Sequence, residues 1–357
     1  MPPGAAGKRA VRMLQLASWF LAQAWTTGRG GKSLEWLANS RQRGASISAQ
    51  AMMPRPQVLC SSRAESLMAT SYASIFRSGL FNGQVVVVTG GGSGIGRCTA
   101  HELASLGAKI ALIGRKPEKL EAVRAEIAAA GGEAERWVCD IREENTVKET
   151  IAAVLARFSR IDGLVNNAGG QFAAPLAQMT QKGWDTVVRS NLTGGFLVAR
   201  ETYTQWMADH GGAIVNIVAD IELGVPLMGH SAAARAGMVN FTKTAAFEWS
   251  GSNVRVNAVA PGWIASSGLD GYPPEMREKI RNLKSHVPAG RLGTESEVAA
   301  AIVFLLSDAA AFISGATLRV DGAAPTAPRG VPLPPHQAPM PAFNGFHLAA
   351  MPMVLRD

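Results

Sequence analysis

From Gln84 onward, short apolar runs alternate with longer stretches in which apolar residues recur at helical spacing. The runs are rich in β-branched residues and occupy residues 85–88, 110–113, 136–138, 164–166, 214–218, 254–259 and 318–320. Several are apolar at every position, as is typical of strands that helices cover on both faces. Strands that alternate with helices predict repeated βαβ units. We therefore expect one doubly wound α/β domain with a seven-stranded parallel sheet and helices on both faces.

The first 67 residues follow neither the strand nor the helix period, and three interpretations compete for them. Residues 11–25 resemble a short signal peptide, whereas the Arg-rich, acid-poor composition suits an organelle transit peptide. The third interpretation is that translation starts at Met68, just before the first strand. We favour the third, so that residues 1–67 are a disordered or wrongly assigned extension and residues 68–324 form the domain.

The composition changes again in residues 325–357, where eight prolines oppose regular structure. This proline-rich C-terminal tail is either disordered or lies across a neighbouring subunit. Phe343, Phe346 and Leu348 favour packing, because a solvated tail has little use for large apolar side chains.

The net charge of +8 is concentrated near the start of the chain. Nine Lys and Arg residues precede residue 64, whereas residues 68–325 carry 24 basic and 24 acidic residues, a net charge of zero (24 − 24 = 0). A nucleic-acid interface needs a basic surface on the folded body, so we expect no such partner. No segment reaches the roughly 20 apolar residues of a spanning helix, so we expect no membrane span.

Cysteine and histidine usage excludes two further classes of site. The three cysteines, Cys60, Cys98 and Cys139, form no disulfide framework and fit a reducing compartment such as the cytoplasm. The six histidines are scattered without ligand spacing, so we expect no metal.

A glycine-rich turn follows the first strand and leads into a helix. Within it, Gly90, Gly94 and Gly96 allow a tight turn and a close approach of a pyrophosphate to the backbone, while Ser93 adds a hydroxyl donor and Ile95 lies at the helix start. The free N–H groups of such a helix start bind phosphates. The pattern predicts a Rossmann-type site for a nicotinamide dinucleotide.

The end of the second strand distinguishes the two forms of that dinucleotide. An acid there would hold the ribose 2′-hydroxyl, but this chain has Arg115 and Lys116. Two cations suit a 2′-phosphate, so we expect NADP(H); the alternative is that they are solvated charges at a helix start. After the third strand, Asp140 is placed to accept from the adenine amino group, with Ile141 beside it.

Four further motifs complete the pattern: Asn166-Asn167-Ala168-Gly169, Ser190-Asn191-Leu192-Thr193-Gly194, Pro261-Gly262 and Val320-Asp321-Gly322. With the glycine turn, they make residues 80–322 resemble the short-chain dehydrogenase/reductase family. The resemblance implies that Asn191 organises water below the active site and that Ile264 and Ser266 face the nicotinamide carboxamide. It adds to the cofactor site Asn167, Ala168, Gly169, Pro261 and Gly262.

The catalytic positions of that family are altered here. Aligned on Arg235-Ala236-Gly237, the chain has Ser231 where the family has its catalytic Tyr, Arg235 where it has Lys, and Val218 where it has Ser. A serine hydroxyl is too weak an acid to replace a phenol, and Arg stays protonated. The site therefore suits carbonyl and alcohol chemistry poorly. Reduction of a C=C bond conjugated to a thioester requires fewer groups from the site, since an oxyanion donor and one proton suffice.

This departure resembles the peroxisomal-type trans-2-enoyl-CoA reductases and, more distantly, the 2,4-dienoyl-CoA reductases. The shared residues are His230-Ser231, Ala233-Ala234-Arg235-Ala236-Gly237, Gly169-Gly170-Gln171-Phe172, Lys182-Gly183-Trp184 and Asn191-Leu192-Thr193-Gly194. The resemblance implies NADPH-dependent reduction of a 2-enoyl-CoA, with an acyl-CoA substrate and a homotetrameric assembly. The chain ends in Leu355-Arg356-Asp357, which is not the Ser-Lys-Leu peroxisomal signal.

Residue roles follow as hypotheses. Ser231, with Gln171 nearby, would donate to the thioester oxygen, and Arg235 would hold the nicotinamide ribose. The proton donor stays open between Asp220, His230, a water and Tyr272. The competing interpretations are that His230 points to solvent, that Asp220 is a loop carboxylate without a role, and that Tyr272 only packs on neighbouring prolines.

Two other functions remain open. One is an alcohol or carbonyl dehydrogenase with a rearranged site. The other is a catalytically weak NADP-binding protein.

Overall fold

A computed structural model of the chain describes residues 71–326, 333 and 338–356. The expectation for residues 1–67 lies outside the described residues.

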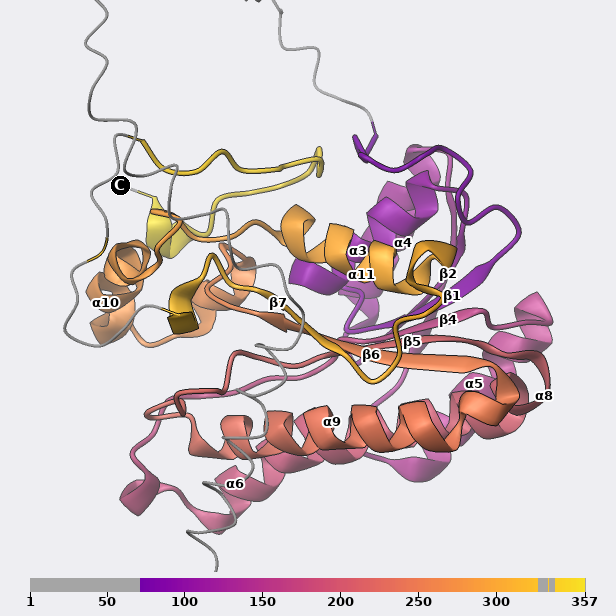
Figure 1. The fold of residues 1–357 in the computed structure, drawn as a ribbon, viewed down its shortest axis with the longest axis horizontal. Helices are drawn as coiled ribbons and strands as arrows, with labels where there is room; N and C mark the ends of the chain where they lie inside the picture. The colour runs from indigo at the N-terminus through magenta and orange to yellow at the C-terminus, as the bar shows by residue number, and fades with distance from the viewer. Residues whose placement is uncertain (1–70, 327–332, 334–337, 357) are drawn as a thin grey trace, which may run out of the picture. The chain divides into compact units, whose positions relative to one another are not determined.

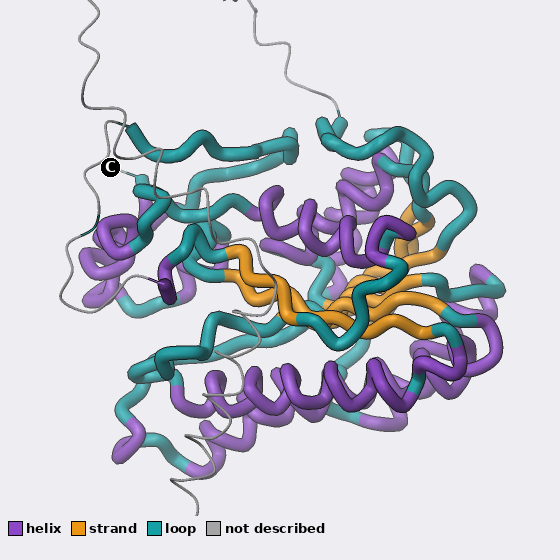
Figure 2. Tube along the Cα trace, viewed as in Figure 1, coloured by secondary structure: helices purple, strands orange, loops and turns teal. Residues whose placement is uncertain are grey.

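The sheet is parallel throughout and its strands have the order β3-β2-β1-β4-β5-β6-β7 (Figures 1 and 2). The strands are β1 Val85–Thr89, β2 Lys109–Gly114, β3 Glu133–Val138, β4 Gly163–Asn166, β5 Gly212–Ile217, β6 Val254–Pro261 and β7 Thr317–Val320. All seven predicted strands and the doubly wound fold are therefore confirmed. The strand order reverses direction between β1 and β4, which is where such folds bind ligands.

One strand is longer than the sequence indicated. β3 begins at Glu133, not at residue 136, and its exposed and covered residues alternate because it lies at the edge of the sheet. Glu133 pairs in register with Lys109, and their side chains form an ion pair of 3.1 Å. Its polar side chains hid the start of this strand from a search for apolar runs.

Helices cover both faces of the sheet. They are α3 Gly94–Ser105, α4 Pro117–Ala129, α5 Glu144–Phe158, α6 Gln181–Val188, α7 Gly194–Thr202, α8 Ala208–His210, α9 Gly229–Glu248, α10 Arg277–Arg281 and α11 Glu295–Leu306. One hydrophobic core joins the sheet to α3, α4 and α11, and a second joins its other face to α5, α7 and α9, as the two layers in Figure 1 show.

Shorter helical turns link these elements. The π-helical turns are η3 Arg189–Thr193 and η4 Tyr203–Met207. The 3₁₀ turns are η2 Leu176–Gln178, η5 Ser250–Ser252, η6 Ser267–Gly271, η7 Pro274–Met276, η8 Asn282–His286, η9 Asp308–Ala310, η10 Ala324–Thr326 and η11 Met353–Leu355. Residues 267–286, which include η6, η7, α10 and η8, are called the substrate loop below.

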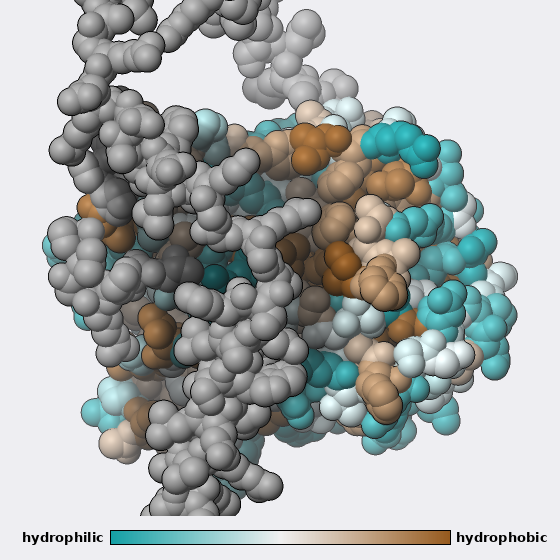
Figure 3. Space-filling model, viewed as in Figure 1, coloured by the Kyte–Doolittle hydropathy of each residue, from teal (hydrophilic) through white to brown (hydrophobic). Residues whose placement is uncertain are grey.

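The described part of the tail packs on its own chain, whereas the sequence suggested packing across a neighbouring subunit. Residues 338–356, called the C-terminal segment below, bury Phe346 to 3% exposure against Tyr72, Cys98 and Ala299. Among the described residues, none of the helices has the length and apolar character that a bilayer crossing requires. On the face shown in Figure 3, hydrophobic side chains lie in small groups among hydrophilic ones.

Candidate functional site

Two adjoining cavities lie over the carboxyl ends of the strands. The first, of about 400 Å³, is lined from β1, β2 and β3, and the second, of about 620 Å³, extends over β4, β5, β6 and the substrate loop. Gly90, Ser93 and residues 168–172 line both. Together they form an elongated groove across the point where the strand order reverses, which suits a two-part ligand such as a dinucleotide.

The glycine turn at the centre of this groove leaves no space for a side chain at Gly90 or Gly96. Gly90 has φ of +67°, and a Cβ on Gly96 would lie 2.4 Å from the Gly90 carbonyl oxygen. α3 starts at Gly94, and the Ser93 hydroxyl before it makes no capping hydrogen bond. The turn therefore presents backbone N–H groups and a free hydroxyl at a helix start, which is a site for phosphate oxygens.

Three cations line the first cavity at the end of β2. Arg115, Lys116 and Lys119 are all exposed, and the described part of the chain gives none of them an ion-pair partner. Lys119 was not predicted, although its position one turn after Lys116 on α4 was a readable signal.

Asp140 and Ile141 also line the first cavity, but Asp140 already has a partner. Arg142 donates to both of its carboxylate oxygens, at 2.9 Å from Nε to Oδ1 and 2.5 Å from Nη2 to Oδ2. These hydrogen bonds hold the pKa of Asp140 below its usual value. Arg142 was not predicted, and it orients the carboxylate that the sequence assigned to the adenine.

The remaining predicted cofactor residues line the second cavity. They are Ile95, Asn167, Ala168, Gly169, Pro261, Gly262, Ile264 and Ser266. Among them, the Asn167 amide donates to the Thr89 carbonyl oxygen at 2.9 Å, which ties the end of β4 to that of β1. Ile264 is buried and bridges to Gly293 beyond the substrate loop.

A chain of hydrogen bonds runs from the helix layer into this cavity. The π-helical turn η3 places the buried Asn191 so that its Nδ2 donates to Ser231 Oγ at 3.3 Å. Ser231 Oγ donates to Gln171 Oε1 at 2.7 Å, and Gln171 Nε2 donates to the Tyr272 hydroxyl at 2.9 Å. Gln171, Tyr272 and Asn191 line the cavity, whereas Ser231 is 3% exposed and lies behind Gln171.

Arg235 lines the same cavity from α9. Its Nη1 donates to the carbonyl oxygen of Ile217 at the end of β5, at 2.5 Å. Burial of the guanidinium lowers its pKa to about 10, so the group stays protonated at neutral pH. In the described residues it has no acidic partner. A half-buried cation without an acidic partner inside a cavity suits an electron-rich ligand oxygen.

His230 and Asp220 lie away from the cavity. The competing interpretation that His230 points to solvent is wrong. This residue is fully buried, its Nδ1 accepts from the Ser231 N–H at 2.8 Å, and its ring packs on Phe172. Asp220 lines a different hollow together with Lys243 and Asp321. Burial raises the pKa of Asp220, but its carboxylate does not line the groove.

No cluster of three or more potential metal ligands occurs within the described ranges. Of the four groups that the sequence left open as proton donors, three were side chains. Only one of these, Tyr272, lines the cavity that holds Arg235.

Comparisons with known proteins cover this whole site. The sequence model of a family described as "Enoyl-(Acyl carrier protein) reductase" matches residues 89–323, which include every residue lining the two cavities. A probable 2,4-dienoyl-CoA reductase of Bacillus subtilis is 36% identical over 242 residues, covering 67% of this chain and 95% of the relative. A 3-oxoacyl-(acyl-carrier-protein) reductase of Thermotoga maritima is 35% identical over 241 residues, covering 67% and 97%. The solved structure of a citronellol catabolism dehydrogenase of Pseudomonas aeruginosa is 58% identical with a TM-score of 0.65, covering 71% of this chain and 99% of that one.

The glycine turn gives the first testable prediction. In Gly96→Ala the new methyl would meet the Gly90 carbonyl oxygen at 2.4 Å. Overpacking of this kind shifts the backbone. Because the N–H groups of the turn then no longer point at the phosphates, the Kd for a nicotinamide dinucleotide should rise on the order of tenfold by calorimetry. Gly251→Ala is the matched control, because a Cβ there meets nothing within 4 Å. Equal Kd values for both variants would show that the turn does not hold the phosphates.

Proposed function

The chain belongs to the short-chain dehydrogenase/reductase family, and we propose that it is an NADP(H)-dependent reductase of the C=C bond in 2-enoyl thioesters such as trans-2-enoyl-CoA. The observation that supports this proposal is that Ser231 and Arg235 stand at the positions where the family has its catalytic Tyr and Lys. Ser231 is buried and bonded to Gln171, and Arg235 is fixed on the Ile217 carbonyl oxygen. The site thus lacks a phenol beside an amine, the pair that exchanges a proton with an alcohol or a carbonyl oxygen.

The groove fits the proposed cofactor. The glycine turn would hold the pyrophosphate, and residues 261–266 would line the nicotinamide end. The exposed cations Arg115, Lys116 and Lys119 are free to pair with a 2′-phosphate, which NADP has and NAD lacks. When bound, NADPH supplies the hydride for the β carbon of the substrate.

The protein's own contribution lies in the hydrogen-bond chain that ends at Tyr272. Asn191 and Ser231 fix the orientation of the Gln171 amide, because the Ser231 hydroxyl donates to its carbonyl oxygen. The amide nitrogen then faces Tyr272, whose hydroxyl must donate elsewhere.

The acceptor of that phenolic proton is poor. It is the Met228 sulfur, 3.8 Å away. A thioester carbonyl oxygen entering the cavity would be a better acceptor, so Tyr272 and Gln171 would stabilise the enolate oxygen as charge develops there. This assignment gives Ser231 the role of positioning Gln171.

A second candidate function is oxidation of an acyclic alcohol. The 58% identical structure carries the name of a citronellol catabolism dehydrogenase, which favours a branched, apolar chain as substrate. The absence of a phenol–amine pair disfavours it.

Turnover with defined substrates tests the proposal directly. Crotonyl-CoA and decenoyl-CoA should support NADPH oxidation, because the site offers an oxyanion donor without an alcohol-type proton relay. Acetoacetyl-CoA, simple ketones and citronellal should not. Citronellol-dependent reduction of NADP⁺ without enoyl reduction would establish the second candidate. Tight NADPH binding without any turnover would show a catalytically weak binding protein.

Cofactor preference rests on the cations at the end of β2. In the double variant Arg115→Ser/Lys116→Ser, the Kd for NADPH should rise on the order of a hundredfold, because each hydrogen bond to a charged group contributes roughly 1.5 kcal/mol or more. The Kd for NADH should stay unchanged. The double variant Arg77→Ser/Lys148→Ser, at two exposed positions outside both cavities, controls for the same loss of two charges. An equal loss of affinity for both cofactors would contradict the assignment.

Tyr272 is expected to be the oxyanion donor. Removing one such donor costs on the order of a hundredfold in kcat, so Tyr272→Phe should lower kcat for enoyl-CoA by about that factor. The Kd for NADPH should stay the same. Tyr203→Phe serves as the control, since the Tyr203 hydroxyl bonds to Ser252, which lines neither cavity. If kcat survives in Tyr272→Phe, the phenol has no part in the reaction.

A further inference from the structure

The C-terminal segment, residues 338–356, runs beyond the residues that the family match covers, which end at residue 323. In Figure 1 this yellow segment passes beside α11 and returns to α10. It therefore contacts two parts of the molecule that the chain itself separates, the helix layer near the glycine turn and the substrate loop.

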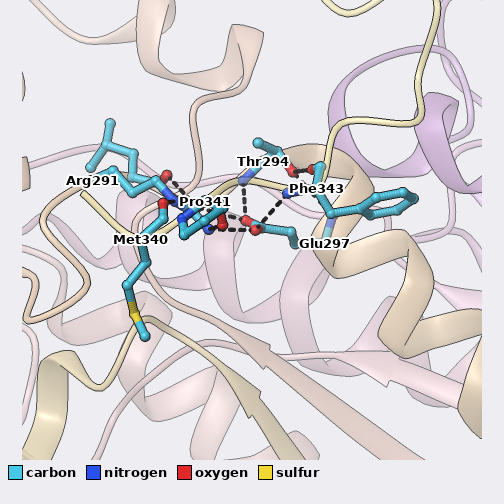
Figure 4. A network of polar contacts seen from close by, with 7 residues as sticks. Arg291, Thr294, Glu297, Met340, Pro341 and Phe343 are labelled. Atoms are coloured by element: carbon cyan, nitrogen blue, oxygen red, sulfur yellow. Dashed lines mark hydrogen bonds and ion pairs between the residues drawn. The ribbon is translucent and has the colours of Figure 1, made fainter. Parts of the chain in front are cut away.

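The first attachment uses the cap of α11. Thr294 and Glu297 form a capping box at the start of that helix. The same two side chains bind the segment: Thr294 Oγ1 donates to the Phe343 carbonyl oxygen at 2.6 Å, and the Phe343 N–H donates to Glu297 at 3.2 Å. Arg291, paired with Glu297 at 2.6 Å, donates to the carbonyl oxygens of Met340 and Pro341 (Figure 4).

A buried aromatic ring strengthens this attachment. Phe346 is 3% exposed and packs on Tyr72 and Cys98, with the Arg97 guanidinium 5.0 Å from its ring centre. The Phe346 N–H donates to Ser296 Oγ at 3.2 Å. Since Arg97 and Cys98 belong to α3, this end of the segment is fixed to the helix whose start forms the glycine turn.

The second attachment lies on the substrate loop. Val354 is 6% exposed and completes an apolar cluster with Leu269 and Ile280, against which Tyr272 packs. The backbone of Val354 is also held from both sides. Its N–H donates to Asp270 Oδ1 at 2.9 Å, and its carbonyl oxygen accepts from Arg281 Nε at 2.9 Å.

We infer that the C-terminal segment is a strap that positions the substrate loop over the cavity, with Val354 as its main positioning residue. The loop has few other anchors of its own, because it consists of short 3₁₀ turns and the five-residue α10. With Val354 in place, Tyr272 keeps its hydrogen bond to Gln171. Without it, the loop opens more often and Tyr272 leaves the position from which it meets the substrate. The consequence for catalysis rests on the proposed function, but the consequence for the loop does not.

Limited trypsin digestion tests the loop directly, because Arg277, Lys279, Arg281 and Lys284 all lie within it. The full chain is compared with Val354→Asp and with a chain ending at Met351. Cleavage within the loop should be faster in both, on the order of tenfold. Met353→Asp is the matched control, because Met353 lies on the same turn but is 67% exposed. It should be cleaved like the unmodified chain.

Enoyl-CoA kinetics supply the second readout. In Val354→Asp, KM should rise and kcat should fall, while the Kd for NADPH should stay unchanged, which also shows that the variant is folded. Loop cleavage in Val354→Asp at the rate of Met353→Asp would overturn the inference. If the unmodified enzyme reduces no enoyl-CoA but Val354→Asp still shows faster loop cleavage, the proposed function fails and the strap stands.

Discussion

The groove depends on the way the carboxyl ends of β1 and β4 are joined. The Thr89 hydroxyl accepts the N–H groups of Asn167 and Ala168, both at 3.0 Å, and the Asn167 side chain donates back to the Thr89 carbonyl oxygen. These two strands are neighbours in the sheet but distant in the sequence, and connections leave them in opposite directions. Because the joint holds them together, the glycine turn and the Ala168 region face each other across one groove. The glycine turn and the cavity that holds Arg235 are therefore built on a common edge of the sheet.

The sequence predicted those features that depend on local pattern. Apolar runs located the strands, and the position of the glycines between a strand and a helix located the turn. The family resemblance placed Ser231, Gln171 and Asn191 in one region, and in the structure a chain of hydrogen bonds connects them. The resemblance could not predict the direction in which each side chain points. Ser231 and His230 are adjacent on α9, yet the serine hydroxyl turns to Gln171, while the imidazole is enclosed by Phe172.

Features that depend on long-range packing were out of reach of the sequence. Asp220 was one of the candidate proton donors, but β5 ends before it and the chain carries it to the side of the sheet next to β7. Arg142 was missed because a charged residue four positions after the end of a strand is ordinarily solvated. The attachment of the C-terminal segment needed the cap of α11, the side of α3 and the substrate loop to come together. No hydrophobic period or sequence motif predicts that these three elements contact one segment.

The altered pair on α9 also limits where the hydride is able to go. A lysine there would lower the pKa of a neighbouring phenol, whereas Arg235 has no phenol beside it and is bonded to the end of β5. The phenol that lines the cavity, Tyr272, comes instead from the substrate loop, and its position depends on contacts outside the sheet.

The contacts that hold the substrate loop are connected to the glycine turn through the C-terminal segment. The C-terminal segment is fixed on α11 and α3, and α3 starts at the glycine turn. Under the proposed function, the Tyr272 hydroxyl is thus supported by the same helices as the turn that would hold the cofactor phosphates. Two groups that must meet within a few tenths of an ångström gain from such a shared support, because a displacement of about 1 Å costs on the order of a hundredfold in rate. A loop built of short helical turns is in this way able to hold Tyr272 at the cavity.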